Sequence, residues 1–153
     1  MAGFDALVIA DALATKYLAA NLTAPTGYPA MRLSTARIPN ALPTSPWVLV
    51  VLRSGEVIIG SSQEATLEYH VLFHYAKHTG DTARDMTAML AWIGVLLTGT
   101  FSGTKLGLSG SQPIKSALPT TFALDVFTYG GDEFYGWDIT VEVMLRDIGW
   151  TIT

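Results

Sequence analysis

Three histidines at a spacing of four residues are the first candidates for chemistry in this chain. His70, His74 and His78 would share one face of a helix, where imidazoles at that spacing can bind zinc. Glu68 or Asp81 would then supply a further oxygen ligand. The surrounding residues, ATLEYHVLFHYAKH, instead alternate large apolar and polar side chains, which favours a strand over residues 65–78. Four residues along a strand span roughly 13 Å, too far for one metal ion to bridge, so we predict no metal site. A histidine-based metal-dependent enzyme is the alternative from another functional class.

Other residue types that carry catalysis do not form a recognisable motif. The segment GLSGSQP lacks the Gly-x-Ser-x-Gly spacing of a serine hydrolase, and the glycines at 99, 103, 107 and 110 match no phosphate-binding loop. Asp132, Glu133 and Asp138 lie near a turn, where carboxylates commonly serve solvation and local hydrogen bonding. The chain has no cysteine, which excludes thiolate chemistry and disulfides. We therefore predict no catalytic residue and no cofactor.

Aromatic residues around a glycine turn are the strongest candidates for binding. They lie in TYGGDEFYGWDITVEVMLRD, residues 128 to 147. Stacking on single-stranded bases would need basic residues between the aromatics, and these are missing. Aromatic side chains around a polar turn are typical of protein interfaces. We predict a contact with another subunit or a partner protein at Tyr129, Phe134, Tyr135 and Trp137.

The composition favours one small domain that is surrounded by partners. With 153 residues, we expect a single domain over residues 1–153 with one core. Half of the residues are hydrophobic and 14% are charged, against roughly 25% in typical soluble domains, which indicates oligomerisation. The formal charge of −4 and the scattered Lys and Arg residues predict no tight binding to nucleic acid.

An uncharged run from Met86 to Thr104 raises the alternative of a small membrane-associated protein. About 20 apolar residues span a bilayer, and the centre of this run, MLAWIGVLL, is apolar. Threonines and three glycines interrupt it, so we expect a helix of the core and no membrane span. The start of the chain, MAGFDALVIADALA, lacks the basic residues of a secretory signal, and we expect no export by that route.

Two helices are expected, each with more apolar surface than one core face requires. The first covers residues 4–22 and the second runs from Asp81 or Thr82 to Leu97. The first helix has two apolar stripes and should pack against its own sheet on one side and a partner on the other. The stripes are Phe4, Leu7, Val8, Leu18 and Leu22 on one side and Ile9, Leu13 and Tyr17 on the opposite side. In the second helix the stripe is Met86, Met89, Leu90, Ile93, Leu96 and Leu97, with Trp92 and Val95 outside it.

The remaining elements are strands. A proline-rich connection over residues 23–47 is expected to hold a short edge strand around AMRLSTARI. Residues 47–60 read as a hairpin with RSGE as its turn, and residues 98–121 as a long loop. FALDVFTY and WDITVEVMLRD then pair through GGDEFYG, with Ile139, Val141, Val143 and Leu145 facing the core. The predicted class is α/β of the α+β type, with a mixed, mainly antiparallel sheet flanked by two helices.

This order of elements resembles the tail terminator proteins of long-tailed bacteriophages. The resemblance covers most of the chain and is strongest in SALPTTFALDVFTYGGDEFYGWDITVEVMLRD, residues 116 to 147, which looks like the closing hairpin of actinobacterial phage versions. In that family a small α/β subunit forms a hexameric ring that caps the tail tube, stops its polymerisation and offers a docking surface to the head connector. Neighbouring virion proteins share this size and composition, so a head-to-tail connector, a stopper or a tail tube subunit is the alternative.

The resemblance also implies partners and a location. It implies a homo-oligomer, a hexamer as in that family, that contacts the tail tube protein and the head–tail connector protein at the head-proximal end of the tail. The subunit would be made in the cytoplasm of the host bacterium, and DNA would pass through the ring without specific binding. The acidic balance of the chain is compatible with such passage, because Lys and Arg drive nonspecific binding to phosphates. The family has no catalytic motif, so the resemblance implies no active-site residue.

Overall fold

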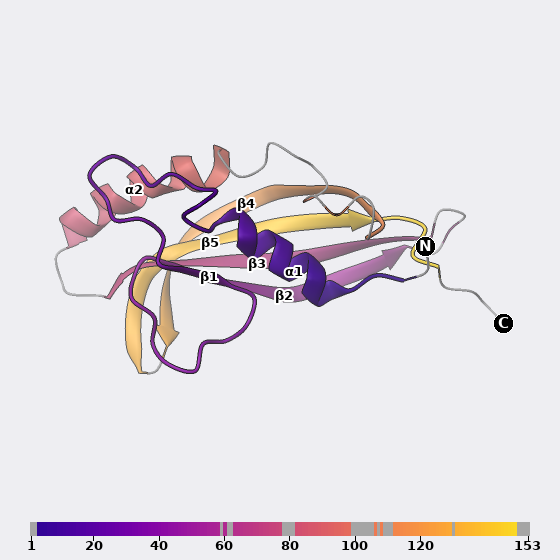
Figure 1. Ribbon diagram of the computed structural model, residues 1–153, viewed down its shortest axis with the longest axis horizontal. Coiled ribbons are helices and arrows are strands. Elements are labelled where there is room, and N and C mark those ends of the chain that lie inside the picture. Colours follow the sequence, from indigo (N-terminus) through magenta and orange to yellow (C-terminus); the bar gives the residue numbers. More distant parts are fainter. Residues whose placement is uncertain are drawn as a thin grey trace.

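The fold is one five-stranded sheet with two helices on the same face (Figure 1). The computed structural model describes residues 3–58, 60, 63–77, 82–98, 106, 108, 112–129 and 131–149. The elements are α1 (Ala6–Lys16), β1 (Leu33–Thr35), β2 (Trp47–Ile58), β3 (Glu64–Lys77), α2 (Thr82–Thr98), β4 (Ile114–Tyr129) and β5 (Asp132–Leu145). The sheet order is β1-β2-β3-β5-β4, with β1 parallel to β2 and the other pairs antiparallel. This mixed, mainly antiparallel sheet with two helices is the predicted fold class, and β1 is the predicted short edge strand.

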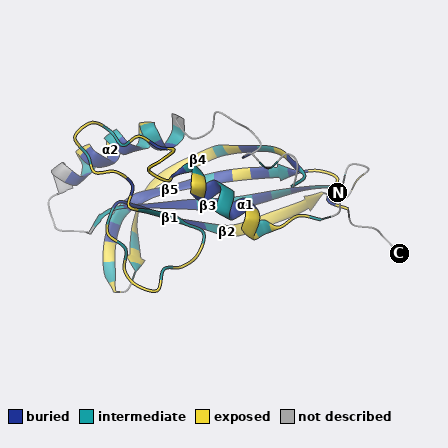
Figure 2. Ribbon diagram, viewed as in Figure 1, coloured by how far each residue is buried: buried dark blue, intermediate teal, exposed yellow. Residues whose placement is uncertain are grey.

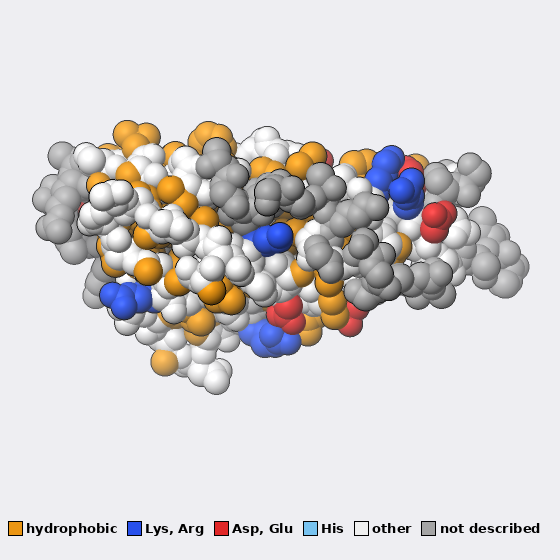
Figure 3. Space-filling view, turned by 45° about the horizontal axis from the view of Figure 1, so that its top comes forward, with side chains coloured by type: hydrophobic (Ala, Val, Ile, Leu, Met, Phe, Trp, Pro, Cys, Tyr) orange, Lys and Arg blue, Asp and Glu red, His pale blue; other side chains and the backbone are white. Residues whose placement is uncertain are grey.

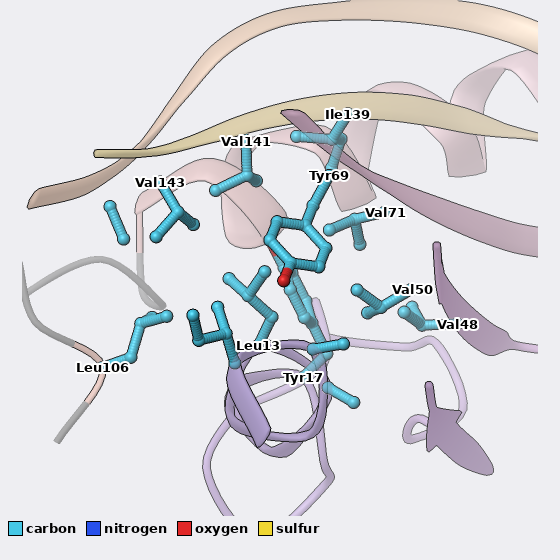
Figure 4. Close-up of a cluster of buried hydrophobic side chains, with 14 of the residues drawn as sticks. Leu13, Tyr17, Val48, Val50, Tyr69, Val71, Leu106, Ile139, Val141 and Val143 are labelled. Carbon is cyan, nitrogen blue, oxygen red and sulfur yellow. The ribbon is translucent and has the colours of Figure 1, made fainter. Parts of the chain in front are cut away.

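The central strands β3 and β5 supply most of the core, because their side chains alternate between the two faces of the sheet. The buried residues on the helix face are Leu67, Tyr69, Val71 and Phe73 of β3 and Ile139, Val141, Val143 and Leu145 of β5. Figure 4 shows these rows meeting Leu13 and Tyr17 of α1. The Tyr69 hydroxyl points to the helix and donates a hydrogen bond to the Ala6 carbonyl oxygen at 2.8 Å. The strand predicted over residues 65–78 is confirmed up to Lys77, with residue 78 outside the described residues, and the inward row predicted for β5 is confirmed.

Helix α1 begins at Ala6, not at residue 4 as predicted, and is shorter than predicted. Asp5 is its N-cap, and its carboxylate accepts hydrogen bonds from the Leu7 and Val8 amides at 2.9 and 3.2 Å. The helix ends at Lys16, not at residue 22, because the Asn21 side chain donates to the Thr15 carbonyl and satisfies one of the last free oxygens. Ile9, Leu13 and Tyr17 are buried as predicted, whereas Leu22, predicted on the opposite stripe, is buried beyond the helix end.

The predicted hairpin over residues 47–60 is wrong. Strand β2 continues through RSGE to Ile58 and pairs with β3 along its whole length. A bulge between Leu52 and Ser54 shifts the pairing register with β3. Gly55 lies so close to Leu67 that an added Cβ would be 3.2 Å from the Leu67 side chain. Because the partner strand extends past RSGE, a continued ladder satisfies backbone groups that a turn would leave unpaired.

The final hairpin is longer than predicted at both ends. Strand β4 begins at Ile114, within the stretch expected to be a loop, and β5 begins at Asp132, within the expected connection GGDEFYG. Gly131 has a φ of 85°, which suits glycine at a tight turn. Bulges next to Ile114 and Pro119 fit the irregular first part of β4 into the ladder, and proline is tolerated there because β4 is an edge strand.

Helix α2 matches its predicted bounds, but the side that it turns to the sheet differs from the predicted one. Met89, Trp92 and Leu96 are fully buried, and the Trp92 ring lies 5.0 Å from that of Phe73. Trp92 was predicted outside the buried stripe and Leu90 within it, yet Leu90 is 63% exposed. The large indole buries more apolar area than a leucine, so it sets which side of the helix faces the sheet.

Candidate subunit interface

The two described histidines face away from the helices and have unrelated surroundings. His70 and His74 lie four residues apart on β3, and His78 lies outside the described residues. Among the residues that the structure describes, no group of three or more His, Asp or Glu side chains could hold a metal ion. Asp132 and Asp138 are six residues apart on β5, roughly 20 Å along a strand, so they do not form a carboxylate pair.

His70 lies in a polar chain that crosses three strands. Its Nδ1 is 2.7 Å from an Asp138 carboxylate oxygen and its Nε2 is 3.0 Å from Glu68. Ser54 donates to the other Glu68 oxygen at 2.9 Å. The hydrogen bond with His70 holds the pKa of Glu68 below its ordinary value, and the bond from Ser54 acts in the same direction. Both ring nitrogens of His70 contact carboxylates, and the chain of hydrogen bonds serves as a cross-strand brace.

His74 belongs to a small second core on the sheet face opposite the helices. Its ring stacks on Trp47 with centroids 3.8 Å apart and an angle of 6° between the planes. Burial lowers the pKa of His74 to about 4, with the backbone of Trp47 and Leu72 offsetting part of the effect. The neutral ring therefore acts as a flat packing surface, together with Leu49 and Leu72.

Two of the four predicted interface aromatics are buried within the subunit. Trp137 is 6% exposed, and its Nε1 donates to the Met89 carbonyl oxygen of α2 at 2.9 Å. Phe134 is buried on the opposite face, against the ring of His74 at 5.9 Å. Trp137 and Ile139 are two residues apart on one strand, so their side chains point to the same face. The alternating pattern therefore already predicted that Trp137 faces the core. The expectation that Trp137 meets another subunit is therefore corrected: the side chain anchors α2 to the sheet.

The other two predicted aromatics, Tyr129 and Tyr135, are half-buried. The Tyr129 hydroxyl donates to the Pro39 carbonyl oxygen, and its ring lies edge-on to Trp47 at 5.3 Å. Tyr135 packs partly against the main core. These contacts hold the hairpin and the proline-rich connection together within one subunit. A contact of Tyr129 and Tyr135 with another subunit stays a prediction.

Four exposed apolar side chains lie on helix α1 or just beyond its ends. Leu7 and Val8 belong to the helix, and Phe4 and Leu18 flank it; all four were predicted to need a second partner. Next to Leu7 lies a groove of about 300 Å³, called here the α1–β2 groove. Its lining is Ala6, Leu7 and Ala10 of α1, Ala36 and Ile38 after β1, Val50, Val51 and Leu52 of β2, and Tyr69. A salt bridge of 2.9 Å between Arg37 and Asp11 ties the segment after β1 to the helix. The groove is apolar and faces solvent.

A second apolar surface lies at the opposite edge of the sheet, on edge strand β4. Phe122, Leu124 and Val126 are 50%, 42% and 45% exposed and alternate with polar or small residues. We call this row the β4 edge. Figure 2 shows the exposure of both β4 and the C-terminal half of β2, while most residues of β3 and β5 between them are buried or half-buried. Figure 3 shows hydrophobic side chains scattered over one face among uncharged polar ones, with the charged groups few and partly side by side. The hairpin over residues 122–147 or a sheet edge was expected as a contact element, but the sequence alone does not show that β4 is the edge strand, because pairing order is not visible in a local pattern.

Neither membrane nor family assignment follows from the remaining observations. Within the described part of the chain, no helix is long and apolar enough to cross a membrane. Comparison with known proteins finds no family model and no curated protein that matches the chain.

Proposed function

We propose that this chain is a structural subunit that closes into a ring, and that the ring is the tail terminator of a long-tailed phage. The observation that carries the proposal is the presence of two different apolar surfaces, the α1–β2 groove and the β4 edge. They lie at the two opposite edges of one sheet. A contact between two different surfaces is heterologous, and heterologous contacts form rings when their rotation closes.

The alternative of a two-fold dimer leaves part of this surface exposed. A dimer that pairs the β4 edge with itself would leave the α1–β2 groove uncovered, and a dimer through the groove would leave the β4 edge uncovered. One head-to-tail contact covers both surfaces in every subunit. The low share of charged residues, 14%, fits a subunit with neighbours on two sides.

The resemblance of residues 116 to 147 to tail terminators suggests which role the proposed ring has. The ring, of six subunits in our proposal, binds the last ring of the tail tube and presents no further tube-like surface, which ends polymerisation. Its other face receives the head–tail connector protein, and DNA passes through without specific contacts. The protein is accordingly placed in the virion, at the head-proximal end of the tail.

Tail tube assembly tests this role. Purified tube protein polymerises with and without this chain, and electron micrographs record tube length and tube ends. We expect shorter tubes, each with extra density at one end. A connector or stopper would leave tube length unchanged, and a tube subunit would enter the tube along its length. Either outcome overturns the terminator role while leaving a ring intact.

The metal-enzyme alternative has a separate test. Metal analysis of the purified protein should show no stoichiometric zinc or manganese. Stoichiometric metal that is lost in a His74→Ala variant would contradict the structural role.

A further inference from the structure

We propose that the ring is held together by a continuous β-sheet, in which β4 of one subunit pairs antiparallel with the free part of β2 of the next subunit. The occupant of the α1–β2 groove is thus a second copy of this chain. This inference rests on the proposed ring and adds the strands, their direction and the side chains that form the contact.

Both strands have a free edge. Strand β1 covers β2 only at Trp47, Val48 and Leu49, and no other described strand pairs with β2 on that side. Among the described residues, the stretch from Val50 to Ile58 therefore has no strand partner on that side, and its first residues, Val50 to Leu52, line the groove. At the other side of the sheet, β4 has β5 as its only described neighbour. Free edges of this length attract further strands.

The direction of the strands makes the pairing antiparallel. Strands β2, β3, β5 and β4 are each antiparallel to the next, so β4 runs opposite to β2. When the next subunit continues the sheet in the same sense, its β4 comes to lie antiparallel to β2. This geometry is the more stable way to extend a sheet.

The apolar rows of the two edges lie on the same face of the sheet. Phe122 is paired with Ile139 and Leu124 with Trp137, both on the helix face. Leu52 of β2 is paired with Tyr69, which is also on the helix face. A rotation about a ring axis keeps the helix face on one side, so Phe122 and Leu124 of one copy face the same side as Leu52 and α1 of its neighbour. They can therefore fill the α1–β2 groove.

The features that usually protect an edge strand are absent from the second half of β4. Lys115 and Pro119 lie near its start, and charged or proline residues of this kind discourage pairing. From Thr120 to Tyr129 the only charged residue is Asp125. On a monomer such an edge would be prone to aggregation, whereas in a ring it is covered.

Cysteine cross-linking tests the contact cleanly, because the chain has no cysteine of its own. Leu52→Cys and Leu124→Cys place one thiol on each edge, at side chains 46% and 42% exposed. With a short bis-maleimide, the double variant should give a ladder of covalent oligomers that ends at the ring size. Each single variant should stay uncross-linked, since a head-to-tail contact brings two different positions together. The control pairs Leu52→Cys with Leu90→Cys, an exposed leucine of α2, and should give no ladder.

The outcomes separate this inference from the proposed function. A cross-linked dimer of the single Leu124→Cys variant would show a two-fold contact and overturn the inference. Two further results would overturn the inference while leaving the ring in place. One is a ring-sized mass in light scattering without a ladder of cross-linked oligomers. The other is an equal ladder from the Leu90→Cys control. A protein that stays monomeric at all concentrations would overturn both the inference and the ring.

Discussion

The centre of the sheet and its two edges are made of similar residues but have opposite relations to solvent. Strands β3 and β5 bury Tyr69, Val71 and Val141 completely, whereas β4 exposes Leu124 and Val126 to about half of their surface. Burial at the centre is accounted for by the two helices on one face and the small aromatic core on the other. At the edges, no described part of the subunit covers the exposed apolar side chains Leu124 and Val126. The difference indicates that the centre holds the subunit together and the edges hold subunits to each other.

The largest effect is expected at the centre, at Gly136. A Cβ at this position would lie 1.8 Å from the Phe73 carbonyl oxygen and 2.6 Å from the Phe127 ring, so Gly136→Ala must push strands apart. We expect a loss of more than about 3 kcal/mol in unfolding free energy, or failure to fold. Gly94→Ala is the matched control, because its added methyl meets nothing within 4 Å in helix α2. It should stabilise by about 1 kcal/mol in denaturant titrations. Equal effects of the two variants would contradict the close approach at Gly136.

The next prediction separates fold from assembly with one substitution in each region. Trp137→Ala removes a buried indole and its hydrogen bond to Met89, and should cost about 3–5 kcal/mol in unfolding free energy. Leu124→Asp, at the β4 edge, should change subunit stability by about 0.5 kcal/mol or less, since the side chain is exposed. The aspartate should abolish oligomers, because a charge would be buried in the contact. Thermal melts and light scattering measure the two effects, and the account fails if Leu124→Asp assembles normally.

The third effect is a dependence on pH that arises on the face opposite the helices. Burial lowers the pKa of His74 from 6.5 to about 4, so the unfolded chain takes up a proton first as pH falls. The contribution of the neutral ring is complete above pH 6.5, declines between pH 6.5 and 4 and is lost below, a change of up to about 3 kcal/mol. His74→Leu should flatten the stability of the subunit across this window relative to the unchanged chain. An unchanged slope in the variant would contradict the burial of His74.

The sequence predicts the central strands better than their ends. The alternation of ATLEYHVLFHYAKH fixes its inward row, because large apolar residues at every second position share one face of a strand. RSGE carries strong turn residues and still lies within β2, since the long partner β3 outweighs a local preference. The same reason explains why β4 begins at Ile114 in place of a glycine-rich loop.

Part of the apolar surface that the proposed interface uses was visible in the sequence. Phe4, Leu7, Val8 and Leu18 are exposed, but only Leu7 and Val8 lie within α1, and Leu22 of the same predicted stripe is buried. The emphasis on Trp137 was misplaced because aromatic content was given more weight than its position in the alternating strand. The β4 edge depends on which strands are neighbours, a property of the whole sheet that no short segment carries.

The central claim, that unpaired sheet edges join copies of this chain into a ring, is tested most directly by negative-stain images of the purified protein. Class averages should show a closed ring with one rotational symmetry, six-fold in our proposal. The Leu124→Asp variant, imaged at the same concentration, should show single subunits. Monomers or two-fold dimers of the unchanged chain at every concentration would contradict the account.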